Sequence, residues 1–355
     1  MTITNWRPLT VLIVCALSGF VLFRWTTDST YGVHRRAPAY DRPGTLSTHA
    51  LRLDGNLTGE AVPVWVPFDT ADMPIDHGRR LETLMLSQSE NGTSASSESS
   101  GNPRQTVLLF GDSNERAIVD ELCLKFGTWA SVVSSKNPPT KSEKWHADAH
   151  VCELANLRLI SFMSYGVMIE KDSQLWERKV ELEGPWAVEE RIGLAKAFVE
   201  TMGWRVDLIV FNSNLWDLMY LHDTHLRLHT VYEFSLSPTT LEAYISRCVT
   251  ALARLRALFP ETKVTFRTLH PLHPGRSIDF FNLRRTVQLN QAALEVVARS
   301  ERDGLDVQLL DVARVLEGWP TTGSQTSGNI LKDKVHLGWN PGLWMYAEMM
   351  LDALA

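Results

Sequence analysis

The chain has 355 residues, of which 44% are hydrophobic and 21% are charged, and its formal net charge is -6. This composition supports a large buried core and excludes an intrinsically disordered chain. The negative charge, with no basic cluster interleaved with aromatic residues, gives no reason to expect a nucleic-acid partner.

The first feature along the chain is an uninterrupted apolar stretch at residues 9–23, with an arginine on each side. It is shorter than the ~20 residues of a usual membrane span but extends through Trp25. We interpret residues 9–25 as a signal anchor that follows a short cytoplasmic tail at residues 1–8. A cleaved signal peptide is the alternative, although no clean small-x-small site follows the run. The flanking positive charges do not settle the orientation.

The next part of the chain is expected to lie between the membrane and the main domain. Residues 26–50 are polar with prolines and glycine, which is typical of a stem. Residues 51–104 contain apolar stretches such as 62–66, which predict an edge strand or a flap, and then a loop rich in Ser, Gly and Asn. Sequons at Asn56 and Asn91 would accept glycans only in a lumenal segment. The layout predicts a single-pass type II protein of the Golgi or endoplasmic reticulum membrane.

Cysteine is sparse in this chain. Of the four cysteines, Cys15 lies in the expected anchor, which leaves Cys123, Cys152 and Cys248. At most one intramolecular disulfide can form among these three, so the chain is not a disulfide scaffold.

From residue 105 to the C-terminus, apolar strands alternate with helical patterns. Continuous hydrophobic runs, as expected for strands buried on both faces, occur at 107–110, 157–163, 208–211, 264–268 and 307–310. Helical periodicity occurs between and after them at 114–126, 187–202, 239–258, 277–300 and 341–354. The alternation predicts one α/β domain at 105–355, a three-layer α/β/α sandwich around a parallel sheet. Active groups are then expected at the carboxyl ends of the strands.

Two short motifs supply the groups that a serine nucleophile needs. Gly111-Asp112-Ser113 follows the first strand of this domain, and a D-x-x-H motif with Asp333 and His336 precedes the last helix. A serine needs an imidazole to take its proton, and the imidazole needs an acceptor to fix its tautomer. Ser113, His336 and Asp333 fit these roles. The alternative is an ordinary turn serine and an unrelated surface motif.

Four segments of the domain belong together as a set. They are the Gly111-Asp112-Ser113 corner with Arg116, the block Asn212-Ser213-Asn214-Leu215-Trp216-Asp217-Leu218, the segment from Arg267 through His270 to His273, and the D-x-x-H motif with Trp339. In combination they resemble the SGNH, or GDSL-like, hydrolases. More closely they resemble the PC-esterase branch, which includes the trichome-birefringence-like polysaccharide O-acetyltransferases.

The resemblance implies roles for the site residues. Ser113 would be the nucleophile, His336 the general base and Asp333 its orienting carboxylate. The oxyanion of the intermediate would be held by the amide of Ser113, the amide of Gly166 and an asparagine side chain.

The asparagine donor is open, because the third block departs from the usual SGNH pattern. If residues 208–211 are the strand, Asn214 stands where the glycine belongs and Trp216 where the asparagine belongs. Asn212 or Asn214 would donate instead, and we favour Asn212.

Four further residues are candidates for substrate binding. The resemblance places Arg116 near the serine, where it would counter charge on the intermediate, and the alternative is a helix-surface pair with Asp120. Arg267 and His270, with His273, would line the acceptor side of the cleft, although a strand-end arginine is commonly a structural tie.

No motif predicts a cofactor or a metal. Neither a G-x-x-x-x-G-K-S/T loop nor a G-x-G-x-x-G loop occurs. Several histidines have spacings that permit a zinc site, but no H-E-x-x-H or C-x-x-C motif accompanies them. We therefore expect surface or cleft histidines, which are His146, His150, His222, His225 and His229.

These observations favour a lumenal, membrane-anchored serine enzyme that passes an acyl group from an acyl donor to water or to a sugar hydroxyl. Acetyl on a glycan is the expected substrate, and a lipid or other small ester stays open because fold kinship does not fix a substrate. Two alternatives come from other classes. One is a catalytically silent glycan-binding protein, which the altered third block favours, and the other is a structural membrane protein that uses the domain as a partner surface.

Overall fold

The structure is a computed structural model that describes residues 44–53, 56–67, 80–81, 84, 104–133, 149–154, 156–169, 185–227, 235–274, 281–322 and 329–355. The expected tail and anchor, most of the expected stem, and Asn91 lie outside these residues. No helix within the described residues is long and apolar enough to span a membrane. The anchor therefore stays a prediction.

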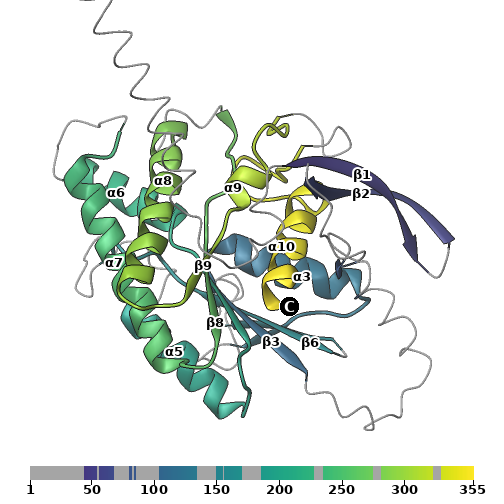
Figure 1. Ribbon diagram of the computed structural model, residues 1–355, viewed down its shortest axis with the longest axis horizontal. Coiled ribbons are helices and arrows are strands. Elements are labelled where there is room, and N and C mark those ends of the chain that lie inside the picture. The colour runs from purple at the N-terminus through teal and green to yellow at the C-terminus, as the bar shows by residue number, and fades with distance from the viewer. Residues whose placement is uncertain are drawn as a thin grey trace, which may run out of the picture. The chain divides into compact units, whose positions relative to one another are not determined.

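A seven-stranded sheet organises the domain that starts at residue 105 (Figure 1). The strand order is β4-β5-β6-β3-β7-β8-β9. All five predicted strands are present and pair in parallel. They are β6 (Leu157–Met163), β3 (Gln105–Gly111), β7 (Leu208–Phe211), β8 (Lys263–Arg267) and β9 (Val307–Leu310). Because β3 lies between β6 and β7 and all three run parallel, their carboxyl ends lie next to one another at the same end of the sheet.

The outer edge of the sheet differs from the predicted parallel arrangement, so the sheet is mixed. Strand β5 (Ala149–Glu153) pairs antiparallel with β6 and with β4 (Ser131–Val133). The connection from β5 to β6 covers only residues 154–156, and such a short link makes a hairpin because a parallel crossover needs about a dozen residues or more. Neither β4 nor β5 is a long apolar run, which is why the sequence pattern missed them.

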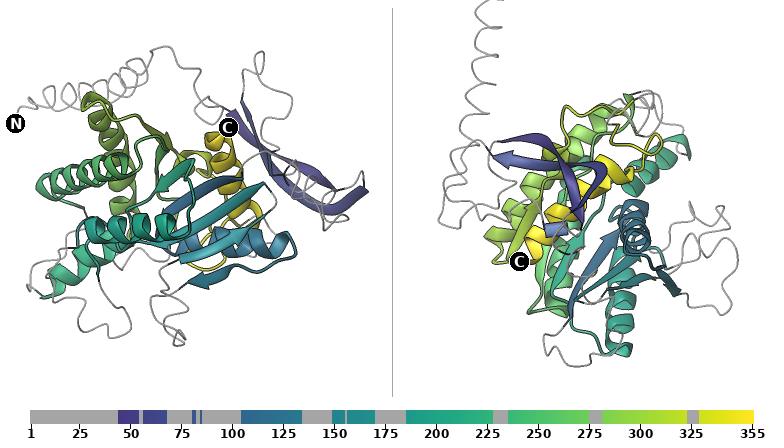
Figure 2. Two further views of the ribbon diagram at one scale, coloured as in Figure 1. Left: turned by 90° about the horizontal axis from the view of Figure 1, so that it is seen from below. Right: turned by 90° about the vertical axis from the view of Figure 1, so that its right-hand side faces the viewer.

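Helices cover both faces of the sheet (Figures 1 and 2). Alternate residues of the strands point to opposite faces, as the pleat requires. In β3, Leu108 and Phe110 belong to one buried cluster, whereas Val107 and Leu109 belong to the other. The first cluster is covered by α5 (Val188–Thr201), α6 (Leu215–Arg227), α7 (Pro238–Leu258) and α8 (Leu283–Arg302). The second is covered by α3 (Ser113–Lys125), α9 (Val312–Val315) and α10 (Trp344–Leu354), with the turn η4 (Trp339–Leu343) before α10.

The α/β fold is therefore as predicted, with a mixed sheet in place of a parallel one. The helices α6 and α9 were not predicted. Helix α8 begins at Leu283, whereas the periodicity placed its start at residue 277, and residues 275–280 lie outside the described part of the chain.

An antiparallel hairpin precedes the domain. Strand β1 (Gly44–Leu53) pairs with β2 (Asn56–Pro67), with an irregularity between Ala50 and Arg52. The apolar stretch at 62–66 lies within β2, as predicted for a strand. Strand β1 begins inside the segment expected to be the stem, and the sequon residue Asn56 opens β2.

One disulfide joins Cys123 of α3 to Cys152 of β5, and Cys248 of α7 is a buried free thiol. This bond agrees with the prediction of at most one intramolecular disulfide among these three cysteines. The bond ties the helix that begins at Ser113 to β5, the strand next to the edge strand β4.

Candidate active site

Ser113 lies at the corner where β3 ends and α3 begins. Asp112 caps the helix, because its Oδ1 accepts the N–H of Asn114 at 2.8 Å, and Glu115 Oε2 accepts the N–H of Asp112 at 2.8 Å. This reciprocal capping box fixes the first turn of α3. A Cβ at Gly111 would lie 2.6 Å from the Glu115 carboxylate, so the corner requires glycine there.

The three side chains of the predicted triad lie in hydrogen-bond contact. Ser113 Oγ is 2.7 Å from His336 Nε2, and His336 Nδ1 is 2.8 Å from Asp333 Oδ2. With the carboxylate at Nδ1, the neutral imidazole carries its hydrogen there and presents Nε2 as the acceptor for the serine hydroxyl. An imidazole in this position can take the hydroxyl proton during nucleophilic attack.

Asp333 also shapes the turn that carries His336. Its Oδ1 accepts the N–H of Val335 at 2.7 Å and that of His336 at 2.9 Å. Partial burial of the carboxyl opposes ionisation, but the hydrogen bonds from His336 and Val335 outweigh it and lower the pKa of Asp333 below its usual value. The group therefore stays a carboxylate and orients the ring.

The chain segment after β8 braces this turn from behind. His270 Nε2 donates to the carbonyl of Val335 at 2.7 Å, and the N–H of His273 donates to the carbonyl of Lys334 at 3.3 Å. Burial, together with the charge of Arg267, lowers the pKa of His270 to about 3. The ring of His270 is therefore neutral, and its single N–H points at the turn.

Arg267 and His270 do not line an open cleft, which corrects the expectation for both residues. Each side chain is 0% exposed. Arg267 Nε donates at 2.6 Å to Glu115 Oε1, two residues after Ser113. Buried acceptors hold both side chains inside the domain, so they tie the strand end to the two parts of the triad.

Glu115 is the centre of a buried polar network beneath Ser113. Besides the bond from Arg267, its Oε1 accepts the hydroxyl of Tyr346 at 3.0 Å and the amide of Asn212 at 3.3 Å. Burial raises the pKa of Glu115 to about 7, against the lowering effect of Arg267. Glu115 and Tyr346 were not among the predicted site residues. The D-x-x-E spacing of the capping box is the sequence signal that identifies Glu115.

The two candidate asparagine donors are buried and bonded inside the domain. Asn214 Nδ2 donates to Asn212 Oδ1 at 3.1 Å and to the carbonyl of Arg267 at 3.3 Å. An amide has two N–H bonds, so Asn214 has none left for an oxyanion. Asn212 gives one N–H to Glu115 and stays the better candidate of the two.

Gly166 lies two residues after a contact between the ends of β6 and β3. The N–H of Ser164 donates to the carbonyl of Gly111 at 2.6 Å, which ties the end of β6 to the end of β3. Gly166 itself has a φ of +90°, a conformation that glycine adopts without strain. The amides of Gly166 and Ser113 therefore come from neighbouring strand ends, as a shared oxyanion site requires.

Arg116 lies half-buried in the first turns of α3. Burial lowers its pKa, while the charges of Asp120 and Asp112 and the hydroxyl of Tyr165 oppose this shift. Asp120 also contacts the sheet, because its Oδ1 is 2.8 Å from His150 Nδ1 on β5, and the pair of Arg116 with Asp120 stays a prediction.

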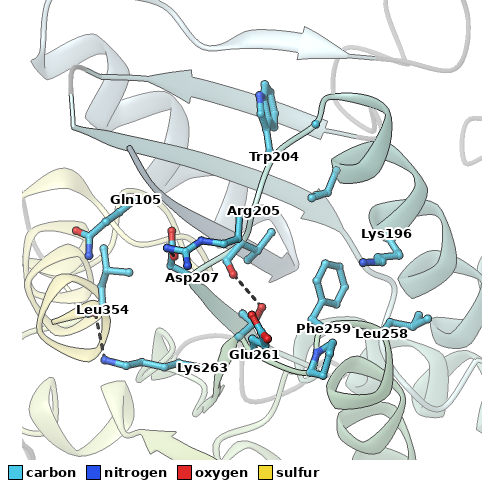
Figure 3. Close-up of a pocket in the computed structure, with 15 residues that line it drawn as sticks. Gln105, Lys196, Trp204, Arg205, Asp207, Leu258, Phe259, Glu261, Lys263 and Leu354 are labelled. Carbon is cyan, nitrogen blue, oxygen red and sulfur yellow. Dashed lines mark hydrogen bonds and ion pairs between the residues drawn. The ribbon is translucent and has the colours of Figure 1, made fainter. Parts of the chain in front are cut away.

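A cavity of about 610 Å³ lies at the opposite end of the sheet (Figure 3). It is lined by Gln105 at the start of β3, Lys263 at the start of β8 and the segment from Trp204 to Asp207 before β7. Lys263 donates to the carbonyl of Leu354 at 3.2 Å, as the dashed line in Figure 3 marks. Because Ser113 follows the carboxyl end of β3, this cavity is not the cleft of the triad.

The histidine spacings do not converge on a metal site within the described residues. No group of three or more His, Cys, Asp or Glu side chains there is placed to hold a metal ion. His222 and His225 lie on α6, and His150 binds Asp120. His146 and His229 lie outside the described residues.

Comparison with known proteins gives weak matches of structure alone. No protein-family model matches the chain, and no curated protein matches it. Similar solved structures include a family 3 carbohydrate esterase of Clostridium thermocellum, with a TM-score of 0.37 and 10% identity over 71% of this chain and 97% of that one. The acetylxylan esterase Axe2 of Geobacillus stearothermophilus gives 0.37 and 13% over 72% and 95%. A GDSL-like lipase of Bacteroides thetaiotaomicron gives 0.36 and 11% over 77% and 98%.

Proposed function

We propose that the chain is a serine acyl-ester enzyme of the SGNH type that works through an acyl-Ser113 intermediate. The observation that carries this proposal is the continuous hydrogen-bonded series from Ser113 Oγ through His336 to Asp333. This order of nucleophile, base and orienting carboxylate is the one that activates a serine in acyl transfer.

The acylation step follows from these contacts. Ser113 Oγ attacks the ester carbonyl carbon while His336 Nε2 takes the hydroxyl proton, and the carbonyl oxygen becomes an oxyanion. The N–H groups of Ser113 and Gly166 stabilise that charge. The tetrahedral intermediate collapses, its bond to the leaving alkoxide breaks, and the imidazolium returns the proton to that oxygen. Asp333 stabilises the imidazolium throughout.

Deacylation reverses these roles with a second hydroxyl. His336 takes a proton from water or from a sugar hydroxyl, whose oxygen attacks the acyl carbon and releases Ser113. Water gives an acetylesterase, and a sugar gives an O-acetyltransferase. The resemblance of four sequence segments to the PC-esterase branch supports acetyl as the acyl group and a glycan as its carrier or acceptor.

We place the enzyme in the lumen of the secretory pathway, anchored through residues 9–25. The disulfide between Cys123 and Cys152 supports an oxidising compartment, where such bonds persist. The sequons at Asn56 and Asn91 support the same side of the membrane. Removal of N-glycans from the cellular protein should increase its gel mobility. An identical mobility of wild type and the double variant Asn56→Gln, Asn91→Gln would argue against a lumenal domain.

The proposed chemistry is tested by intact-mass analysis of the purified full-length chain after incubation with p-nitrophenyl acetate. We expect an acetyl adduct on wild type and none on Ser113→Ala, and turnover that disappears in His336→Ala. A folded wild type that gives neither adduct nor turnover, and that a fluorophosphonate does not label, would overturn the proposal.

A catalytically silent glycan-binding protein is the second candidate. The observation that favours it is the commitment of both Asn214 N–H bonds inside the domain, which removes one asparagine from the oxyanion site. This candidate predicts no fluorophosphonate labelling of Ser113 and full cellular function of Ser113→Ala.

A further inference from the structure

Gly166 lies in the segment that follows β6. The backbone of this segment is held by two buried side chains that follow β7, Ser213 and Asp217. The N–H of Val167 donates to Ser213 Oγ at 2.9 Å, and the N–H of Met168 donates to Asp217 Oδ1 at 2.8 Å. Ser213 Oγ in turn donates to Asp217 Oδ2 at 2.5 Å. Asp217 thus accepts the N–H of Met168 directly and is linked to the N–H of Val167 through the Ser213 hydroxyl.

The Asp217 carboxylate also fills the space beside Gly166. A Cβ built on Gly166 would lie 2.5 Å from Asp217 Oδ1, so the glycine backbone packs directly against the carboxylate. Asp217 is 0% exposed, and burial raises its pKa to about 6 against the hydrogen bonds from Ser213 and Met168. Above that pH it is ionised and accepts from every neighbour that it touches here.

Helix α7 closes the arrangement from the other side. Arg247 Nη1 donates to the carbonyls of Met168 at 3.1 Å and Val167 at 3.4 Å. The hydroxyl of Tyr244 donates to the carbonyl of Ser213. Donors and acceptors of this short segment are therefore bound from two helices, which leaves it little freedom to move.

We propose that Asp217 is a positioning residue for the oxyanion donor. Its carboxylate fixes the backbone from Gly166 to Met168 and so aims the Gly166 N–H at the charge that develops when Ser113 attacks. The inference rests on the proposed acyl-enzyme chemistry and adds a residue that does not touch the substrate. An N–H contributes to oxyanion stabilisation only when it is held in place before the reaction.

A second buried carboxylate in the domain serves as a matched control. Glu348 of α10 accepts the N–H of Arg80 at 2.9 Å and that of Leu81 at 3.1 Å, and burial raises its pKa to about 7. Like Asp217, it binds two consecutive backbone amides from inside the core. It lies outside the triad and the Gly166 segment, so its amide variant reports the structural cost of such a substitution alone.

The test compares Asp217→Asn with Glu348→Gln in the full-length chain. In Asp217→Asn the new amide faces Ser213 as a donor, so Ser213 loses its acceptor and the segment loosens. We expect kcat with p-nitrophenyl acetate to fall by about 10²-fold, the cost of one misplaced oxyanion donor, with KM unchanged. Ser213→Ala, a milder variant, removes the hydroxyl that joins Val167 to Asp217 but keeps the direct bond from Met168 to Asp217, and it should lose about tenfold.

The Kd of phenylboronic acid is a second measurement, and it should not change if Asp217 has a purely structural role. Its boron bonds to Ser113 Oγ while His336 Nε2 takes the hydroxyl proton, and it becomes tetrahedral and anionic with a hydroxyl in the oxyanion site, so its affinity reports transition-state stabilisation. We expect Asp217→Asn to raise its Kd by about the same factor that lowers kcat. Glu348→Gln should lower the melting temperature and leave kcat and this Kd at wild-type values.

The outcomes separate the two proposals. Wild type without Ser113-dependent turnover overturns the proposed function and this inference with it. If wild type is active but Asp217→Asn and Ser213→Ala keep its kcat and its boronate affinity, the inference about Asp217 is overturned and the proposed function stands. The same holds if Glu348→Gln loses as much kcat as Asp217→Asn at an equal loss of melting temperature.

Discussion

The two halves of the triad are held by different parts of the molecule. Ser113 stands above a buried network in which Glu115 and Arg267 are 1% and 0% exposed. His336 and Asp333 stand on a turn where 37% and 51% of their side-chain surface is exposed. Ser113 is therefore positioned by the core, whereas His336 is positioned by local hydrogen bonds at the surface.

This difference predicts that the two halves fail in different ways. A buried pair that loses one partner leaves an uncompensated charge in the core, so folding suffers. Surface substitutions away from such features change stability little. Variants of the turn should therefore lose activity and keep their free energy of unfolding. Variants of the buried network should lose both activity and stability.

The largest effect is expected for His336→Ala on the exposed side. Removal of the base should lower turnover of p-nitrophenyl acetate by about 10⁶-fold. Because the side chain is exposed, the free energy of unfolding should stay within about 0.5 kcal/mol of wild type. Steady-state kinetics and urea unfolding measure the two quantities. A marked loss of stability would show that the turn belongs to the cooperative core.

The next effect is expected for Asp333→Asn. The new amide would donate to His336 Nδ1 and leave the ring hydrogen on Nε2, where it cannot accept the proton of Ser113. A tautomer error of this kind costs about 10⁴-fold in kcat. Stability should change little, because the carbonyl oxygen of the amide still accepts the N–H groups of the turn. Wild-type kcat in this variant would remove Asp333 from the triad.

On the buried side, Arg267→Met should destabilise the fold strongly. The substitution leaves the Glu115 carboxylate without its cation, and breaking a buried pair in this way costs about 3–5 kcal/mol. Urea unfolding near pH 8 measures the loss. The matched control is Arg299→Met, which breaks a surface pair with Glu242 at 2.8 Å and should leave the unfolding curve nearly unchanged. Equal effects of the two variants would contradict the contrast between core and surface.

The two sides should also differ in the sign of their pH dependence. Burial raises the pKa of Glu115 from 4.5 to about 7, so its contribution to stability is fully present below pH 4.5 and lost as the pH rises through about 7. The pKa of Asp333 is lowered from 3.8, so its contribution is present above that pH and lost as the pH falls further.

Arg267→Met sharpens this pH test. Without the cation that opposes the rise, the pKa of Glu115 should increase further, so the destabilisation by the substitution should grow as the pH rises from about 7 to about 9. Two pKa units amount to roughly 3 kcal/mol, which sets the scale of the change. A difference between wild type and variant that is independent of pH would show that Glu115 does not titrate in this range.

The sequence predicts the centre of the sheet well and its edge poorly. Residues 107–110 and 208–211 are apolar on both faces, and this pattern is specific for a central strand. Strand β5 contains His150 and Glu153, and His150 is buried against Asp120 of α3. A tertiary contact of this kind leaves no periodic signal in the sequence.

The candidate site shows the same division. Spacing and order pointed to Ser113, Asp333 and His336, which the structure brings into contact. They did not show that Arg267 and His270 face inward, because a strand end has no period that distinguishes cleft from core. The D-x-x-E spacing marks Glu115 as a capping residue, but it does not show the buried network around it, since the partners come from β8, the end of β7 and α10.

The smallest effect is expected where the two regions meet, at Asn114. Its Oδ1 accepts the N–H of Leu337 at 3.1 Å, directly after His336, while its Nδ2 donates to Asp112 Oδ1 at 3.0 Å. Asn114→Ala leaves a buried N–H without an acceptor, which costs about 1–3 kcal/mol. The turn can then drift from the serine, so kcat should fall by about 10–100-fold.

The control is Asn282→Ala, which removes the N-cap of α8 and should cost about 1 kcal/mol of stability with full activity. If Asn114→Ala matches this control in both measurements, Asn114 only supports the Asp112 cap of its helix, and the Ser113–His336 contact alone holds His336 in place beside Ser113.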